Sequence, residues 1–345
     1  MKHEYRVGIA GYGVVGKRRH LAIEKNKYLN VIAVCDKNIN QKNEKSSKVL
    51  FFNNYKDLLK TPIDILFVCM TNDINPIVTI AGLQKGLHVF CEKPPGRSVR
   101  DVLETIKIEK KNKKLKLMYG FNHRFHGSVQ KALEITKKNS LGKIINLRGV
   151  YGKSQLITFN QPLWRTKREI AGGGVLLDQG IHMVDLMQLF IGKITEVNSF
   201  ITNNFWKYNV EDNAYAIMKN KEDVVCMLHS SATQWRHRFE LDINFEKGNL
   251  ILSGILSSSK SYGFESLTII KADPTKDNGS PKEEKILFYE DKSWEMEINE
   301  FTKSIVNDKK ISSGNSQDAL NTIKTIYAIY YADKKWRQKF SIPKP

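Results

Sequence analysis

Two segments of the chain combine ionisable residues with a spacing that suits proton transfer. In the first, three glycines at 172–174 precede an apolar stretch that carries Asp178, His182 and Asp185. Residues four apart in a helix lie about 40° apart on one face, so Asp178 is expected beside His182. There it would orient the imidazole and leave one ring nitrogen free as a base. The alternatives are a core histidine satisfied by its aspartate neighbours and a metal ligand. With one histidine and no cysteine on this face, we expect no metal.

The second segment is Glu92-Lys93-Pro94-Pro95, directly after a short apolar run. The Lys93 ammonium could stabilise a substrate oxygen that gains negative charge, or carry a proton. Pro94 would restrict the backbone, and a cis Lys93–Pro94 peptide bond is compatible with such a turn. In a chain with this many lysines, the alternative is a solvated loop lysine.

A scaffold for these segments is predicted in the first 120 residues, where short apolar runs alternate with helical stretches. Continuous apolar strands are typical of a sheet covered on both faces, and strand–helix alternation favours a parallel, doubly wound sheet. Ser98 is a good N-cap for a helix over 99–111. The expected strands are 5–10, 29–35, 63–69, 87–91 and 116–119.

A dinucleotide-binding motif follows the first of these strands. Its residues are Gly11-Tyr12-Gly13-Val14-Val15-Gly16, and its glycines allow a tight turn, close approach of a pyrophosphate and close helix–strand packing. Asp36 follows 20 residues after Gly16, where a carboxylate accepts hydrogen bonds from ribose hydroxyls and repels a 2′-phosphate. The motif therefore favours NAD as cofactor, and the neighbouring Lys37 keeps NADP open.

After about residue 120 the pattern changes to shorter, partly alternating strands and amphipathic helices. We expect an open, mostly antiparallel sheet with helices against it, a polar loop over 272–284, and two closing helices at 294–305 and 316–337, the second capped by Ser316. The expected strands are 195–201, 213–218, 224–230, 239–245 and 250–252.

Length and composition indicate a globular protein of about two domains. Its 345 residues are 41% hydrophobic. No apolar run is long enough for a membrane span, and the first residues lack the apolar stretch of a signal peptide, so we expect neither feature. Four cysteines without a CxxC pair lead us to expect a reducing, cytoplasmic setting. The net charge is +19, and 43 of the 55 cationic residues are lysines spread along the chain. This pattern favours a solvated surface, or a field that attracts an anionic ligand, over specific nucleic-acid binding.

Taken together, the motifs resemble those of the Gfo/Idh/MocA family of NAD(P)-dependent oxidoreductases, which includes glucose–fructose oxidoreductase and inositol dehydrogenase. The resemblance extends over nearly the whole chain. It rests on the glycine turn, on Glu92-Lys93-Pro94 and on the run from Gly172 to Asp185, with further likeness at 120–125, 164–165 and 316–320. It implies a Rossmann domain over 1–121. An α/β domain with a large, open, mostly antiparallel sheet would follow over 122–345, with the option that the last helix packs back on the first domain.

The resemblance also implies roles for single residues. Lys93 would be the catalytic lysine, His182 the acid/base and Asp178 its partner, and all three would contact the substrate. The dinucleotide site would include Lys93 as well and, in addition, Thr71, Asn72, Glu92, Asn122, Trp164 and Arg165. Arg124 and Arg165 would bind the substrate. The loop 71–75 lacks the proline and histidine often seen in the family, which affects the contacts expected there.

These observations predict an enzyme that oxidises a secondary hydroxyl of a sugar, or reduces the ketone. By family analogy and basic charge, the substrate would be a nucleotide-linked or otherwise anionic sugar of surface-polysaccharide biosynthesis. We expect a homodimer or homotetramer formed through the second domain's sheet, with no specific nucleic-acid or membrane partner. The alternative is a non-catalytic, dinucleotide-sensing regulatory protein on the same fold.

Overall fold

The computed structural model of the protein describes residues 4–38, 48–157, 163–257, 260–272, 275 and 279–345. The chain forms two compact units. Unit 1 contains residues 1–122 and 294–320, and unit 2 contains residues 123–293 and 321–345. The sequence prediction divided the chain once, after residue 121. The difference is the segment 294–320, which returns to the first unit.

Unit 1 is built on a parallel sheet with the strand order β3-β2-β1-β4-β5-β6 among the described residues. The order reverses between β1 and β4, and doubly wound sheets bind their ligands at the carboxyl ends of the strands where such a reversal occurs. The predicted parallel, doubly wound sheet is confirmed. Its strands are β1 (Tyr5–Ala10), β2 (Leu29–Cys35), β3 (Leu50–Phe52), β4 (Ile65–Val68), β5 (His88–Glu92) and β6 (Leu117–Gly120).

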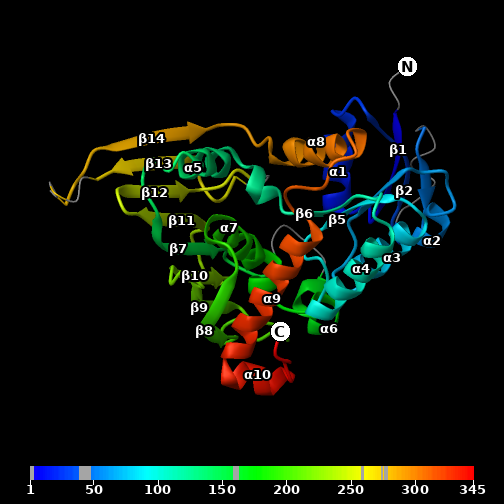
Figure 1. The fold of residues 1–345 in the computed structure, drawn as a ribbon. Coiled ribbons are helices and arrows are strands. Elements are labelled where there is room, and N and C mark those ends of the chain that lie inside the picture. The colour runs from blue at the N-terminus through cyan, green and yellow to red at the C-terminus, as the bar shows by residue number, and fades with distance from the viewer. Residues whose placement is uncertain (1–3, 39–47, 158–162, 258–259, 273–274, 276–278) are drawn as a thin grey trace. The chain divides into compact units, whose positions relative to one another are not determined.

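The helices of unit 1 flank this sheet (Figure 1). Ser98 caps α4 as predicted: its hydroxyl accepts from the Asp101 N–H, and Asp101 accepts in return from the Ser98 N–H. The late helix α8 belongs here because Asn26 donates to Asn299 and Glu297 pairs with Arg19. The helices are α1 (Val14–Glu24), α2 (Tyr55–Leu58), α3 (Asn75–Gln84), α4 (Val99–Lys111) and α8 (Ser293–Val306).

Unit 2 is built on a mixed sheet with the strand order β14-β13-β12-β11-β7-β10-β9-β8 among the described residues. The one parallel pair in this part of the chain is β7 with β10, so the expected open, mostly antiparallel sheet is confirmed. The strands are β7 (Ile144–Gly152), β8 (Ile194–Thr202), β9 (Asn213–Asn220), β10 (Val225–Ser231), β11 (Arg238–Phe245), β12 (Gly248–Ser253), β13 (Glu265–Lys271) and β14 (Glu283–Phe288).

Helices cover one face of the second sheet: α5 lies on β12, β13 and β14, and α7 lies on β7 and β10 (Figure 1). The other face is open, and along β8, β9 and β10 it carries exposed apolar side chains. The helical elements are η2 (Asn122–Phe125), α5 (Gly127–Lys137), η3 (Leu163–Thr166), α6 (Arg168–Ala171), η4 (Leu176–Gly180), α7 (Ile181–Ile191), α9 (Ser316–Ala332) and α10 (Lys334–Phe340).

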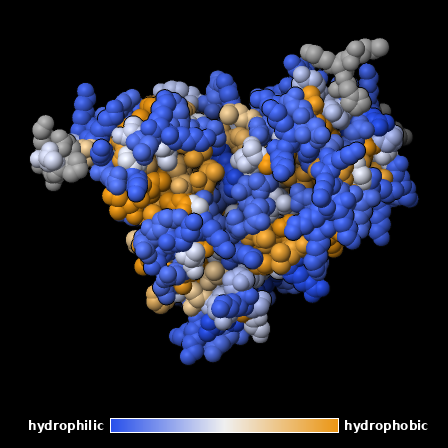
Figure 2. All heavy atoms as spheres, viewed as in Figure 1, coloured by the Kyte–Doolittle hydropathy of each residue, from blue (hydrophilic) through white to orange (hydrophobic). Residues whose placement is uncertain are grey.

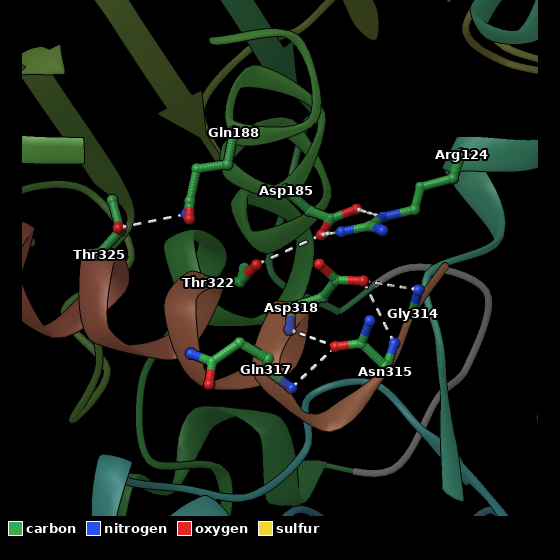
Figure 3. Close-up of polar contacts among 9 residues, drawn as sticks. All are labelled: Arg124, Asp185, Gln188, Gly314, Asn315, Gln317, Asp318, Thr322 and Thr325. Atoms are coloured by element: carbon green, nitrogen blue, oxygen red, sulfur yellow. Dashed lines mark hydrogen bonds and ion pairs between the residues drawn. The ribbon is translucent and has the colours of Figure 1, made fainter. Parts of the chain in front are cut away.

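Several local expectations were wrong in detail. The strands β3, β7, β13 and β14 were not predicted, and β14 begins at Glu283, inside the stretch expected as a loop. The closing helix ends at Ala332, because Asp333 starts a new helix by accepting from the Trp336 N–H. The cap of α9 is Asn315 instead of Ser316, since Asn315 accepts from two N–H groups of the first turn (Figure 3).

Hydrophilic residues cover most of the face drawn in Figure 2, in agreement with the lysine-rich composition. Among the described residues, no helix combines the length and apolar character needed to cross a membrane. In the same part of the chain, no group of three or more histidine, cysteine, aspartate or glutamate side chains is arranged to hold a metal ion.

Candidate active site

The glycine turn lies between β1 and α1, at the carboxyl edge of the first sheet. Gly11 has a φ of +91°, and a Cβ there would collide with the Cys69 carbonyl; a Cβ at Gly16 would collide with the Gly11 carbonyl. Gly13 has open space on its Cβ side, and Val14 is 61% exposed. The turn therefore packs tightly against the protein on one side and is open on the other, where a pyrophosphate could approach the backbone.

Asp36 lies directly beside this turn. Its carboxylate accepts from the Tyr12 N–H at 3.1 Å and from the Asn38 N–H at 3.0 Å, which holds it at the end of β2. The neighbouring Lys37 is exposed. A carboxylate held next to an open glycine turn fits the adenosine ribose of NAD.

The ends of β4 and β5 are linked through Asn75. Its side-chain oxygen accepts from the Met70 N–H at 3.0 Å, and its amide nitrogen donates to the Pro94 carbonyl at 3.3 Å. The Lys93–Pro94 peptide bond is cis. Asn75 thus joins the loop that contains Thr71 and the buried Asn72 to the turn that presents Lys93.

Glu92 turns its carboxylate toward a buried arginine. Arg19, 0% exposed, approaches Glu92 Oε1 with Nε at 2.5 Å and Glu297 Oε2 with Nη2 at 2.7 Å. Its guanidinium also lies over the rings of Phe90 and Trp294, at 4.4 and 4.2 Å. Burial lowers the pKa of Arg19, but the two carboxylates outweigh it and hold that pKa above its usual value. The expected contact of Glu92 with the dinucleotide stays a prediction.

In unit 2, the segment after the three glycines starts with a π-helical turn, η4, and continues as α7. A single α-helix was expected. Asp178 lies in the π turn and His182 in the first turn of α7. The His182 ring is buried and stacks on His123, with centroids 3.7 Å apart and planes 13° apart. His123 Nε2 is in turn 3.0 Å from the Tyr151 hydroxyl.

Asp178 is half-buried between two cations. The Lys153 Nζ is 3.1 Å from Asp178 Oδ2, and the Arg165 Nε is 3.5 Å from Asp178 Oδ1. Arg165 also lies over the Trp164 ring at 4.4 Å. The structure therefore brings together Asp178, Trp164 and Arg165 as the sequence suggested and adds Lys153. The orientation of His182 by Asp178 stays a prediction.

Arg124 forms a bidentate ion pair, called here the fork, with Asp185. Asp185 is the third ionisable residue, after Asp178 and His182, of the segment that follows the three glycines. Its Nε and Nη2 donate to the two carboxylate oxygens at 2.7 Å each, and Thr322 donates to Asp185 at 3.3 Å (Figure 3). Both side chains of the fork are buried. The expected contact of Arg124 with the substrate stays a prediction.

Further polar side chains near Asp178 were missed: Gln179 is the next residue of the same turn, and its partner and the other side chains come from distant strands and loops. Gln179 donates to the Tyr262 hydroxyl at 2.7 Å, and His237 bridges Ser154 and Ser261. Burial, and then the nearby Lys153, lowers the pKa of His237, so its ring is neutral at pH 7. The spacing of these residues in the sequence contains no motif that would have grouped them.

Two protein-family models match most of the chain. Residues 5–121 match the model of an oxidoreductase family with an NAD-binding Rossmann fold, and residues 129–251 match the GFO/IDH/MocA C-terminal domain. D-glucoside 3-dehydrogenase of Escherichia coli (strain K12) is 28% identical over 70% of this chain and 74% of its own length. Myo-inositol 2-dehydrogenase of Thermotoga maritima is 24% identical over 80% of each chain.

Among solved structures, a levoglucosan dehydrogenase in complex with NADH superposes with a TM-score of 0.85. The superposition covers 97% of this chain and 98% of that one, at 18% identity. This likeness establishes the fold across both units.

Proposed function

Because the chain belongs to the Gfo/Idh/MocA family of oxidoreductases, we propose that it oxidises a secondary hydroxyl of a sugar with NAD, or catalyses the reverse reduction. The observation that carries the proposal lies in unit 1. There the open glycine turn, the Asp36 carboxylate and the cis turn of Lys93 all lie at the carboxyl ends of β1, β2 and β5.

Unit 1 is the NAD-binding Rossmann domain of the family. The backbone N–H groups that follow Gly13 would hold the pyrophosphate, and Asp36 would accept hydrogen bonds from the ribose. When bound there, NAD would supply the hydride acceptor for oxidation of the carbinol carbon. A 2′-phosphate would meet the Asp36 charge, which favours NAD, although the exposed Lys37 leaves binding of NADP possible.

The chain's own residues would handle the proton and the developing charge. Oxidation of the alcohol removes a hydride from carbon and a proton from oxygen, so a base is needed. His182 takes that proton through a ring nitrogen, with Asp178 as its acidic neighbour, while the Lys93 ammonium donates a hydrogen bond to the substrate oxygen as it gains negative charge. In the reverse direction His182 returns the proton.

The substrate that we propose is an anionic sugar, such as a nucleotide-linked sugar of surface-polysaccharide biosynthesis. Two observations support this choice. Lys153 and Arg165 together carry two positive charges against the single charge of Asp178, and the chain has a net charge of +19. The relatives described above are named for a glucoside and for inositol. Neutral sugars are therefore the substrates with which anionic sugars have to be compared.

The test is the Lys93→Ala variant, assayed by NADH formation with nucleotide-linked sugars, glucosides and inositol. We expect kcat to fall by about 10²–10⁴-fold, because the variant lacks the donor to the charged oxygen. The affinity for NAD, measured by calorimetry, should stay close to that of the wild type. Lys113→Ala, which removes an exposed lysine of the same unit, is the matched control.

Near-normal turnover of Lys93→Ala would exclude the proposed role of this residue. If the wild-type chain binds NAD but turns over none of the sugars, the regulatory alternative replaces the dehydrogenase. Turnover of neutral sugars alone would retain the dehydrogenase and reject the anionic substrate.

A further inference from the structure

A buried glutamate outside the predicted site contacts the start of the helical segment 176–191. Glu211, two residues before β9, is 0% exposed. Its Oε2 accepts from the Gly174 N–H at 2.8 Å, its Oε1 accepts from the Leu176 N–H at 3.0 Å, and its backbone carbonyl accepts from the Val175 N–H at 3.3 Å. Glu211 therefore accepts hydrogen bonds from three successive backbone N–H groups.

This position is chemically favourable for a carboxylate. The first N–H groups of a helix have no partner within the helix and carry a partial positive charge. Tyr330 of α9 completes the site by donating its hydroxyl to Glu211 Oε1 at 2.7 Å. Burial raises the pKa of Glu211 above its usual value. This rise is opposed in part by the Tyr330 hydrogen bond, the charge of Arg168 and the backbone N–H groups, each of which lowers the pKa.

The same contacts explain two of the three glycines. A Cβ on Gly173 would overlap the Tyr330 hydroxyl, and a Cβ on Gly174 would overlap the Glu211 backbone carbonyl. Larger residues at these positions would push the start of the segment away from Glu211. The glycines thus permit the close approach that the hydrogen bonds require.

A second anchor lies on β10. The Ser230 hydroxyl donates to the Val175 carbonyl at 3.2 Å, and a Cβ on Gly180 would be only 2.6 Å from the Ser230 Oγ. The π turn η4 is therefore held at its start by Glu211 and along its length by β10. Because Asp178 lies in this turn and His182 follows it, the anchors determine where both side chains point.

We propose that Glu211 and Tyr330 are positioning residues of the reaction, which hold the π turn so that Asp178 and His182 meet the substrate correctly. This inference rests on the proposed role of His182 as the base. Neither residue needs to contact the substrate itself, and both act through the backbone of 174–176.

The first test is Glu211→Gln, which keeps the shape of the side chain but leaves only one oxygen to accept. One of the two N–H groups at Gly174 and Leu176 then loses its acceptor, so its amide exchange, followed by NMR, should accelerate. We expect kcat to fall about tenfold to about a hundredfold, as for a small misplacement of a catalytic group. The solvent isotope effect on kcat should rise because proton transfer becomes slower, and the KM for NAD should not change.

The second test uses the Tyr330 hydroxyl. Gly173→Ala should lower kcat because its methyl group collides with that hydroxyl, and adding Tyr330→Phe removes the shortest of these contacts, so it should raise kcat part of the way toward that of Tyr330→Phe alone. Tyr330→Phe keeps the Glu211 carboxylate and serves if Glu211→Gln does not fold. Tyr331→Phe, which alters the next residue of α9, is the matched control.

Two results would overturn the inference: unchanged amide exchange at 174–176 in Glu211→Gln, or faster exchange with kcat and the isotope effect unaltered. If the wild type oxidises no sugar, the proposed function fails. Amide exchange at 174–176 then tests by itself whether Glu211 anchors the π turn. Faster exchange in Glu211→Gln would then support the anchoring of the turn.

Discussion

Asp178 shows how a side chain can acquire partners that its sequence neighbours do not reveal. Helical spacing suggested His182, four residues on, whereas the structure adds the Lys153 ammonium at 3.1 Å and the Arg165 guanidinium at 3.5 Å. Lys153 follows the last residue of β7 and is 7% exposed, so it is an unusual lysine in a chain whose lysines are mostly at the surface. Its position makes it a candidate for binding a negative group on the substrate.

Lys153→Met should therefore weaken binding of a charged substrate more than of a neutral one. Methionine keeps most of the apolar stem and removes the ammonium. Losing one charge-assisted hydrogen bond, worth about 1.5 kcal/mol, should raise the KM for a nucleotide-linked sugar about tenfold, with a smaller change for a glucoside. Steady-state kinetics with both substrates checks this, and Lys143→Met is an exposed control in unit 2. Equal effects on both substrates would argue against an anion-binding role.

At the scale of elements, the position of α8 depends on a buried charge cluster. Arg19 of α1 is the cation shared by Glu92, at the end of β5, and Glu297 of α8. Gly120 completes the site, because a Cβ there would lie 2.8 Å from Glu92 Oε2 and 3.2 Å from Arg19 Nη2. One guanidinium thus connects the helix after the glycine turn, the strand that leads to Lys93 and a helix from the end of the chain.

Arg19→Met should destabilise unit 1 strongly because it leaves two buried carboxylates without their cation. A buried pair broken in this way costs about 3–5 kcal/mol in the free energy of unfolding. Urea denaturation, followed by far-UV circular dichroism, measures the loss. The control is Arg6→Met, which removes an exposed arginine of β1 that pairs with Asp64. It should leave the urea midpoint nearly unchanged. Comparable losses for the two variants would show that burial does not govern the strength of the Arg19 cluster.

At the scale of the whole molecule, the charge and the open sheet face determine what the surface can bind. Most of the +19 charge belongs to solvated lysines. The open face of unit 2 differs, since exposed apolar residues adjoin across strands: Phe200 is opposite Tyr215, and Ile217 is opposite Met227. Farther along the same face, Asp242 and Asn244 of β11 are polar. An apolar area of this kind supports the proposed association of copies of the chain.

Ile217→Glu should convert a homodimer or homotetramer into smaller species, because it puts a charge at the centre of the apolar area. Light scattering coupled to size-exclusion chromatography gives the mass of each variant. Asn244→Glu, on the polar part of the same face, is the matched control and should leave the mass unaltered. A wild-type chain that is monomeric at micromolar concentration would contradict the proposed association.

Much of unit 1 was predictable because its signals are local. Buried parallel strands are continuous apolar runs, the glycine turn needs residues without a Cβ, and Ser98 caps α4 within its own turn. Two of the strands that were missed have weak patterns: β3 has three residues, and β14 is half charged and mostly exposed. Their pairing with neighbouring strands, which no local pattern contains, makes them strands.

The predicted site residues and their partners divide in the same way. Lys93, His182, Asp178 and Asp36 were recognisable from short motifs, because a turn or helix places such residues within a few positions of one another. Their partners were not: Glu211 lies 35 residues from Leu176, Lys153 lies 25 residues from Asp178, and Glu297 comes from the far end of the chain. Contacts between distant segments arise only when sheets and helices pack, and buried charges are then stable only where that packing supplies a partner.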